Sequence, residues 1–277
     1  MQTLQTPNKK LLLIKCGGSI INNNTAELNI LLQDISALKA LGYQIVLVHG
    51  GGPDINQLCD QLGLKSTFSD GLRVTTSEIL AVTQMALLGK TNCGLVHTLN
   101  QNDILALGLS GHDANLLIAR FVDQANLGYV GEIHCVNTEL LNSLLALGIT
   151  PVIAPLAIDD TGNSLNINAD LAAAAVAIAM NAEQLILLSD IDGYYANYPD
   201  PTSVVKTLSA AEVTQLLAES ANVTDGMRPK LTACLNAVNG GVNSAHIVNG
   251  NNPQSLINSV QKPNQIGTSV IQGALSC

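Results

Sequence analysis

The segment Lys10-Leu11-Leu12-Leu13-Ile14-Lys15-Cys16-Gly17-Gly18-Ser19 joins a short apolar run to a glycine-rich turn. A second segment has the same order, because the apolar run Gln44–Val48 ends in His49-Gly50-Gly51-Gly52. A short apolar run that ends in glycines predicts a buried strand, and leucines at helical spacing between the two segments predict a helix. The sequence therefore predicts a unit of strand, turn and helix that repeats along the chain.

The same alternation continues beyond these two segments. The apolar runs Thr150–Ile153 and Gln184–Ser189 predict further strands, and Asp170–Met180 predicts a helix that is buried on every side. Strands that alternate with helices favour an α/β fold, an open three-layer αβα sandwich with a mainly parallel central sheet. Ligands of such sheets bind beyond the carboxyl ends of the strands, where both glycine-rich turns and Asp190-Ile191-Asp192-Gly193 would lie.

Two segments have the spacing of a capping box. They are Thr75-x-x-Glu78 and Ser209-x-x-Glu212. In this motif the hydroxyl accepts a hydrogen bond from the first turn of the helix, and the glutamate reaches back to the cap. The spacing predicts that helices begin after Thr75 and after Ser209.

The composition excludes several classes of protein. Twelve Lys and Arg against 21 Asp and Glu give a net charge of −9, which disfavours binding to nucleic acid or to an anionic membrane. The longest apolar run, Leu171–Met180, is too short for a membrane span of about 20 residues, and Leu11–Ile14 is too short for a secretory signal. The six cysteines form no Cys-x-x-Cys pair, which predicts reduced thiols in a cytoplasmic protein and neither a zinc site nor a disulfide scaffold.

The two glycine-rich turns are the main candidates for a binding site. Glycine lets backbone N–H groups approach a ligand, and a helix N-terminus adds partial positive charge, so both features suit a phosphate. Either turn alone is explained equally well as a tight turn, but the pair, with Lys15 beside the first, favours phosphate. Gly89-Lys90-Thr91 matches only the end of a P-loop, and His49–Gly52 does not extend to a dinucleotide-binding pattern. We interpret His49 itself as a hydrogen-bonded turn residue.

Polar residues elsewhere in the chain provide further candidates. Asn166 and Asn168 alternate on a predicted strand, and Asp170 follows them as a helix cap, as a residue that faces a ligand, or as both. Lys230 lies where a helix begins, a position at which a lysine is ordinarily a surface cation. Arg73 is a candidate for bidentate binding of a carboxylate, because the chain has so few cations.

Six segments, in this order and with this spacing, resemble the amino acid kinase family and, within it, the acetylglutamate kinases. They are Lys15-Cys16-Gly17-Gly18-Ser19, His49-Gly50-Gly51-Gly52-Pro53, Gly71-Leu72-Arg73-Val74-Thr75, Asn166–Asp170, Leu188-Ser189-Asp190, and Thr224-Asp225-Gly226-Met227 with Lys230. The resemblance spans Lys10 to Ile271, and the third and fourth segments together separate this branch from carbamate, uridylate and aspartate kinases. It implies ATP-dependent phosphorylation of the side-chain carboxylate of N-acetyl-L-glutamate in arginine biosynthesis, with Mg²⁺ carried by the nucleotide.

The resemblance also implies roles for particular residues. Lys15 and Lys230 would flank the transferring phosphoryl group, and Asp170 would hold both ammonium groups in place. The acceptor would be bound by Gly51, Gly52, Arg73, Asn166 and Asn168. The phosphates and the nucleotide would be bound by Gly17, Gly18, Gly50, Asp190, Gly193, Tyr194, Thr224 and Met227. Phosphoryl transfer needs mainly positioning and neutralisation of charge, which this set would supply, and no residue is implied as a metal ligand.

Domain organisation and assembly follow from the same resemblance. Residues 1–182 would form an N-terminal lobe for the amino acid and for dimerisation, and residues 183–277 a C-terminal lobe for ATP. Arginine-inhibited members of the family share an added N-terminal helix that builds a hexamer, whereas here Met1–Lys10 is polar and contains Pro7. Val248–Asn258 also lacks the usual His and Glu of the arginine site. We therefore expect a homodimer that arginine does not inhibit, and nothing supports docking of a PII-type signalling protein.

Two alternatives stay open. A sibling kinase could act on another acylated amino acid, such as a carrier-bound aminoadipate, but an acidic carrier would need a basic cluster that the sequence lacks. A non-catalytic relative could bind a nucleotide or effector, but it would not need Lys15, Asp170 and Lys230 together. Thr76 departs from the family, in which an acidic residue is common at this position.

Overall fold

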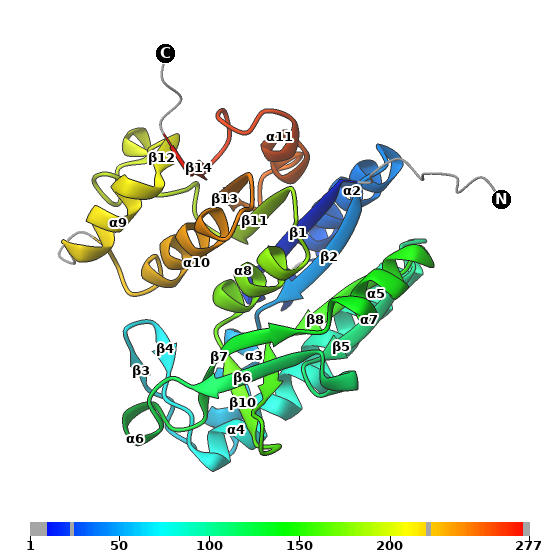
Figure 1. Cartoon of the computed structure of the whole chain (residues 1–277), viewed down its shortest axis with the longest axis vertical. Helices are drawn as coiled ribbons and strands as arrows, with labels where there is room; N and C mark the ends of the chain where they lie inside the picture. The colour runs from blue at the N-terminus through cyan, green and yellow to red at the C-terminus, as the bar shows by residue number, and fades with distance from the viewer. Residues whose placement is uncertain (1–9, 23–24, 220–222, 274–277) are drawn as a thin grey trace.

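An eight-stranded sheet forms the centre of the computed structural model, which describes residues 10–22, 25–219 and 223–273 (Figure 1). The order of its strands is β12-β14-β13-β11-β1-β2-β8-β5. Their bounds are β1 (Leu11–Cys16), β2 (Gln44–His49), β5 (Ala106–Ser110), β8 (Thr150–Ala154), β11 (Gln184–Ser189), β12 (Thr207–Ser209), β13 (Ser244–Asn249) and β14 (Thr268–Ile271). Only β12 and β14 run antiparallel to the other six strands, so the predicted mainly parallel sheet is confirmed.

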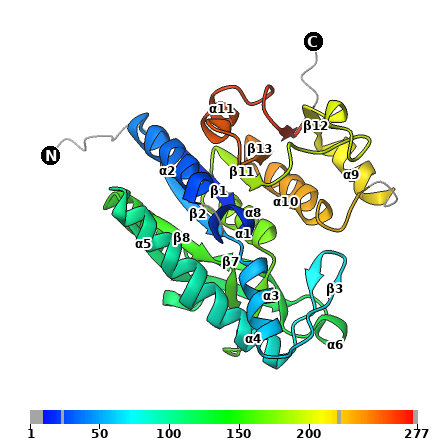
Figure 2. The same cartoon turned by 180° about the vertical axis from the view of Figure 1, so that it is seen from behind.

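Helices cover both faces of this sheet and complete three layers, which the opposite views of Figures 1 and 2 show. One face carries α7 (Thr138–Ala146), α8 (Ala169–Ala179), α9 (Ala210–Ala218) and α10 (Arg228–Asn239), and the other carries α2 (Thr25–Ala40), α5 (Cys93–Gln101) and α11 (Ser255–Gln261). In the central strand, Leu11 and Leu13 pack toward the first set of helices, while Leu12 and Ile14 pack toward the second. A parallel strand that is covered on both sides has to be apolar throughout, which explains the Leu-rich run.

A small closed barrel and a hairpin lie beside the central sheet, and the alternation of apolar runs does not reveal this division. The barrel contains β6 (Leu117–Phe121), β7 (Val130–Val136), β9 (Leu156–Ile158) and β10 (Ser164–Ile167), and the hairpin contains β3 (Phe68–Ser69) and β4 (Leu72–Arg73). The remaining helical segments are α1 (Gly18–Asn22), α3 (Gly52–Gln61), α4 (Ser77–Gln84), η1 (Met85–Asn92), η2 (Asp113–Asn115), α6 (Gln124–Leu127) and η3 (Pro201–Ser203).

The two predicted capping boxes have different outcomes. Ser209 and Glu212 form a complete capping box at the start of α9, as predicted. The prediction for Thr75 is wrong, because Thr76 is the residue that caps α4 and accepts a hydrogen bond from the backbone of Ile79. The hydroxyl of Thr75 is buried and donates instead to the carbonyl of Arg73. Thr76, which departs from the family pattern, therefore serves as the N-cap of α4.

One helical stretch bears on the question of a membrane span. Ser77–Gln101, which joins α4, η1 and α5, is long and apolar enough to cross a membrane by length and composition alone. A single stretch of this kind is weak evidence, because core helices of soluble proteins have the same properties, and 44% of its most apolar 18-residue window is buried. Leu95 and Leu99 pack within the core beneath the sheet. The expectation that the chain does not cross a bilayer stays a prediction.

Candidate active site

The carboxyl ends of the central strands surround a cavity of about 410 Å³. β1, β2 and β11 all end here, and they are followed by the two glycine-rich turns and by Asp190. The lining includes Lys15, Gly17, Gly18, Gly50, Gly51, Gly52, Arg73, Asn166, Asn168, Asp170, Asp190 and Lys230. The fold therefore brings most of the predicted site residues to one place, at the edge of the sheet where ligands of α/β folds bind.

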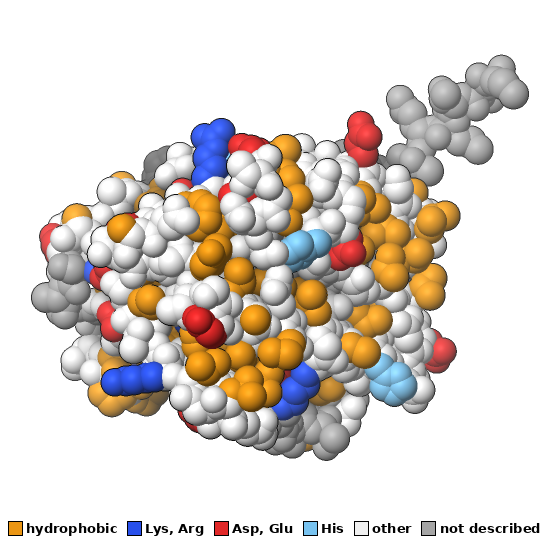
Figure 3. All heavy atoms as spheres, turned by 90° about the horizontal axis from the view of Figure 1, so that it is seen from below, with side chains coloured by type: hydrophobic (Ala, Val, Ile, Leu, Met, Phe, Trp, Pro, Cys, Tyr) orange, Lys and Arg blue, Asp and Glu red, His pale blue; other side chains and the backbone are white. Residues whose placement is uncertain are grey.

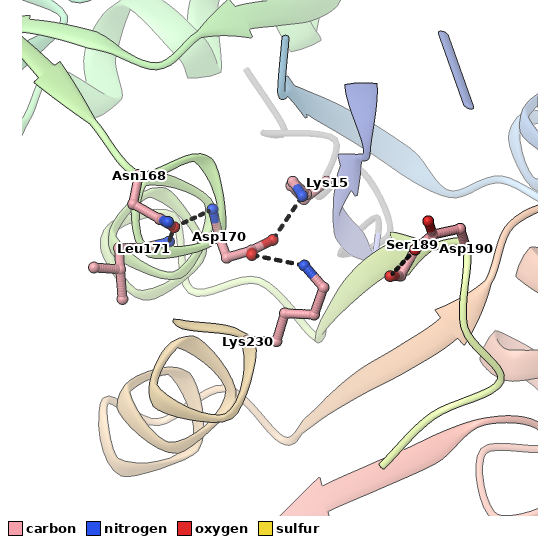
Figure 4. Close-up of polar contacts among 7 residues, drawn as sticks. All are labelled: Lys15, Asn168, Asp170, Leu171, Ser189, Asp190 and Lys230. Atoms are coloured by element: carbon pink, nitrogen blue, oxygen red, sulfur yellow. Dashed lines mark hydrogen bonds and ion pairs between the residues drawn. The ribbon is translucent and has the colours of Figure 1, made fainter. Parts of the chain in front are cut away.

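Two lysines from distant parts of the chain meet at one carboxylate. Figure 4 shows Lys15, from β1, and Lys230, from α10, both ending at Asp170 in the first turn of α8. The Lys15 ammonium is 2.8 Å from Oδ1 of Asp170, and the Lys230 ammonium is 3.0 Å from Oδ2. All three side chains are largely buried. Each oxygen of Asp170 thus binds one cation, and both cations face the same cavity.

Burial and charge set the ionisation of these three groups. Burial alone would raise the pKa of Asp170, but the two ammonium groups more than offset it and hold this pKa well below its usual range. Burial lowers the pKa of Lys15, although Asp170 acts in the opposite direction. Lys230 is also desolvated, but Asp170 and Asp190 raise its pKa above the ordinary value. Asp170 is therefore the permanent counter-ion of the pair.

Asn168, and not Asp170, caps helix α8. Its side-chain oxygen accepts hydrogen bonds from the backbone N–H groups of Asp170 and Leu171, at 2.9 and 3.2 Å. Of the two roles considered for Asp170, the cap is therefore wrong. With the helix end already satisfied by Asn168, the carboxylate of Asp170 is free to bind the two lysines.

The two glycine-rich turns pack directly against each other. A Cβ at Gly18 would lie 2.9 Å from Pro53 Cδ and 3.2 Å from the backbone nitrogen of Gly51. A Cβ at Gly51 would lie 2.4 Å from a methyl group of Leu87. A side chain at Gly18 would force the two turns apart, and one at Gly51 would clash with Leu87 of η1, so glycine is needed at both positions.

The hairpin β3–β4 carries Arg73 into the wall of the same cavity. Its guanidinium lies over the ring of Phe68, 4.7 Å from the ring centroid, and donates to the Ser66 hydroxyl and weakly to the Gly52 carbonyl. Among the residues that the structure describes, no carboxylate forms an ion pair with Arg73. Across the cavity, the amide of Asn166 donates to the Thr75 hydroxyl at 3.1 Å. A buried cation beside an amide is a suitable pocket for a small acylated carboxylate.

A second cavity, of about 370 Å³, adjoins the first and shares Ser189, Asp190 and Lys230 with it. Its other lining residues are Ile191, Tyr194, Tyr195, Tyr198, Thr224, Gly226 and Met227. Four of the predicted phosphate and nucleotide residues therefore lie on its wall: Asp190, Tyr194, Thr224 and Met227. An apolar, aromatic cavity that continues from a cationic one suits a nucleotide whose phosphates reach toward the lysines.

Gly193 lies outside the linings of both cavities. Its φ is +142°, and a Cβ there would lie 2.5 Å from the Thr268 hydroxyl, so its place in the turn depends on backbone freedom. Sequence reasoning missed Tyr195 and Tyr198. The signal was available, because three of the five tyrosines of an aromatic-poor chain fall between residues 194 and 198.

No group of three or more His, Cys, Asp or Glu side chains in the described part of the chain could hold a metal ion. His49 is fully buried, and burial lowers its pKa to about 4, so the ring is neutral near pH 7. The prediction that His49 is hydrogen-bonded is confirmed, since its ring contacts Gly50 and Asn92, but the residue ends strand β2 and the turn begins after it.

The sequence model of the amino acid kinase family matches residues 10–249, and the chain belongs to this family. Among its relatives are acetylglutamate kinases. The one from Prochlorococcus marinus (strain NATL1A) is 42% identical over 262 residues, which cover 95% of this chain and 86% of the relative. The one from Symbiobacterium thermophilum is 40% identical over 272 residues, covering 95% and 92%.

Solved structures agree on the fold. The structure of smu.665 from Streptococcus mutans superposes with a TM-score of 0.82 at 28% identity, covering 95% of this chain and 99% of that one. Carbamate kinase from Giardia superposes with a TM-score of 0.69 at 16% identity, covering 96% of this chain and all of that one, which supports the fold alone. The predicted fold of this family is therefore confirmed.

Proposed function

We propose that this chain is an acetylglutamate kinase, which transfers the γ-phosphoryl group of ATP to the side-chain carboxylate of N-acetyl-L-glutamate in the second step of arginine biosynthesis. The observation that carries the proposal is the convergence of Lys15 and Lys230 on Asp170, in a cavity lined by two glycine-rich turns. Relatives of about 40% identity over nearly the whole chain support the choice of substrate.

The reaction needs no general base. A carboxylate oxygen of the acceptor forms a bond to the γ-phosphorus, the bond from this phosphorus to the β,γ-bridging oxygen breaks, and ADP leaves with the electron pair. Negative charge spreads over the transferring group, and two ammonium groups at its sides stabilise this charge. Asp170 keeps the two cations apart from each other, and the N–H groups of Gly18 and Gly51 bind the phosphoryl oxygens.

The two substrates approach this point from different lobes. Residues 1–182 bind the acceptor, with Arg73 on its α-carboxylate, Asn166 on its acetamido group, and Gly51, Gly52 and Asn168 along the pocket. Residues 183–277 bind ATP, with Tyr194, Thr224 and Met227 around the nucleoside. The position of Arg73 in the first cavity and of the three tyrosines in the second supports this division.

Mg²⁺ would come with the nucleotide. Asp190 lines both cavities, and one carboxylate at the position expected for phosphates fits an ion that is held mainly by phosphates and water. The ion would neutralise phosphate charge, while the Gly18 N–H binds a phosphate oxygen. Gly17 and Gly50 shape the two turns, because their N–H groups donate to the carbonyls of Leu188 and Cys16.

The assembly is a homodimer, and arginine does not inhibit it. The edge strand β5 supports dimerisation, because it leaves Leu107 42% exposed at the edge of the central sheet. Residues 1–9, on which the expectation about the N-terminal helix rests, lie outside the described residues. Light scattering with and without arginine tests this part, and a hexamer would contradict it.

An ATP-dependent hydroxamate assay tests the main proposal, because hydroxylamine traps an acyl phosphate directly. We expect product with N-acetyl-L-glutamate and none with L-glutamate or without ATP. Product from an aminoadipate on an acidic carrier would favour the sibling kinase, but Lys and Arg side chains stand apart from one another on the face seen in Figure 3. Nucleotide binding without any product would favour a non-catalytic relative.

A further inference from the structure

His49, the last residue of β2, connects a helix on one side to the glycine-rich turn on the other. Its Nδ1 lies 2.9 Å from the carbonyl oxygen of Gly50, and its Nε2 lies 3.0 Å from the amide nitrogen of Asn92. A carbonyl oxygen only accepts hydrogen bonds, so Nδ1 must carry the proton. Nε2 is then the acceptor for the Asn92 amide. The contacts therefore define a single neutral tautomer, which agrees with the lowered pKa of this ring.

This tautomer fixes the orientation of one peptide group in the phosphate site. The carbonyl of Gly50 and the N–H of Gly51 belong to the same planar trans peptide, in which they point in opposite directions. Gly50 and Gly51 line the first cavity, whereas His49 lies behind them. When His49 holds the carbonyl on its own side, the N–H of Gly51 must point to the cavity side.

The residues that hold His49 belong to an unusual helix. Asn92 ends the π-helical segment η1, and its amide also donates to the carbonyl of Val152 at 3.0 Å. The preceding residue, Thr91, donates to the buried Asp54 at 2.7 Å, just beyond the turn. Consecutive residues of η1 thus hold both ends of the turn. π-Helical segments are rare and are found mostly at functional sites, which fits this arrangement.

We propose that His49 is a positioning residue for phosphoryl transfer, which acts through the Gly50–Gly51 peptide and is itself held in the Nδ1–H tautomer by Asn92. The inference rests on the proposed function, because it is the transferring phosphoryl group that the Gly51 N–H would bind. His49 touches no substrate. It keeps a hydrogen-bond donor aimed at the position where charge develops, so that the donor need not reorient during the reaction.

Two substitutions at the same position separate positioning from packing. In His49→Asn the side-chain amide lies near the place of Nδ1 and can still donate to Gly50. In His49→Gln the amide lies near the place of Nε2, and Gly50 loses its partner. We expect kcat for hydroxamate formation to fall about 10- to 100-fold in His49→Gln and less than about fivefold in His49→Asn. The KM for the acceptor should change little in either, since the interaction forms mainly in the transition state.

A measurement on the unsubstituted protein does not depend on how the variants fold. The ¹⁵N chemical shifts of the imidazole ring distinguish the Nδ1–H from the Nε2–H tautomer, and we expect Nδ1–H for His49. An Nε2–H ring, or equal loss of kcat in two folded variants, would overturn the inference. Absence of any hydroxamate from the unsubstituted protein would instead overturn the proposed function, and the ring shifts would still report the tautomer.

Discussion

At the scale of single residues, Asp170 connects stability to chemistry. Its carboxylate binds two buried cations, at 2.8 and 3.0 Å, and removing it would leave both ammonium groups without a counter-ion in a desolvated site. Breaking a buried ion pair in this way costs about 3–5 kcal/mol. The same residue therefore has to be present for the fold as well as for the reaction.

We expect Asp170→Asn to lower the free energy of unfolding by roughly 3 kcal/mol and to reduce kcat by at least about 100-fold, because the two lysines lose their fixed spacing. Urea unfolding and the hydroxamate assay measure the two effects. Lys10→Ala is the matched control, since it removes an exposed ion pair with Glu183 and should leave both values unchanged. An Asp170→Asn protein as stable as its parent would show that the three charges do not form one unit.

Lys15→Met separates charge from packing at the other end of this cluster. Methionine keeps most of the buried side-chain volume, and Asp170 keeps Lys230 as its partner. We therefore expect the melting temperature to change little while kcat falls by about 10²–10³. Differential scanning calorimetry measures the melting temperature, and the hydroxamate assay measures kcat. A large loss of stability with an unchanged kcat would show that Lys15 is a structural residue.

At the scale of elements, the hairpin β3–β4 is where the two halves of the site touch. Gly71 has a φ of +77°, and a Cβ there would lie 2.5 Å from the carbonyl of Asp225 and 2.8 Å from Pro229. Asp225 shortly precedes α10, and Pro229 lies in the first turn of this helix, next to Lys230. The hairpin that carries Arg73 thus packs against the start of the helix that carries Lys230. This packing is possible because Gly71 has no side chain.

We expect Gly71→Ala to raise the KM for N-acetyl-L-glutamate by roughly tenfold, because the clash displaces Arg73 from the acceptor pocket. Gly63→Ala is the matched control, since Gly63 also has a positive φ, +68°, but open space around its Cβ position. The control should lose about 1 kcal/mol of stability from backbone strain and keep its KM. Equal KM values for the two variants would contradict a specific contact between hairpin and α10.

At the scale of the whole molecule, what could be predicted from the sequence is what local patterns encode. Leu11–Ile14 is apolar throughout because helices cover both faces of β1, so the strand and the layered fold follow from the local pattern. The cap at Asn168 could not be chosen over Asp170, because both residue types cap helices and only the packing of α8 against two lysines decides. The π-helix of η1 could not be predicted from local pattern, and its last two residues contact Asp54 and His49, which lie far away in the sequence.

Two buried histidines make the stability of the whole protein depend on pH. His246 lies between the hydroxyls of Ser244 and Ser269, and burial lowers its pKa from 6.5 to about 4, as it does for His49. The unfolded chain takes up a proton near pH 6.5, but the folded protein takes it up only near pH 4. Folding is therefore favoured fully above pH 6.5, and the free energy of unfolding decreases as the pH falls through this window. The difference between 6.5 and about 4 corresponds to roughly 3 kcal/mol for each histidine.

Urea unfolding at intervals between pH 7.5 and pH 4.5 measures this dependence, and His246→Gln removes one of the two titrating rings. The variant should lose less stability than its parent over the same interval. The slope of its free energy of unfolding against pH should correspond to up to about one fewer proton taken up on unfolding. Asp170 does not contribute to the difference between the two proteins. Its pKa is held low, so its contribution to stability is lost only below about pH 4. Parallel curves for the two proteins would mean that the folded and unfolded states bind the same number of protons at His246, so that burial does not lower the pKa of this ring.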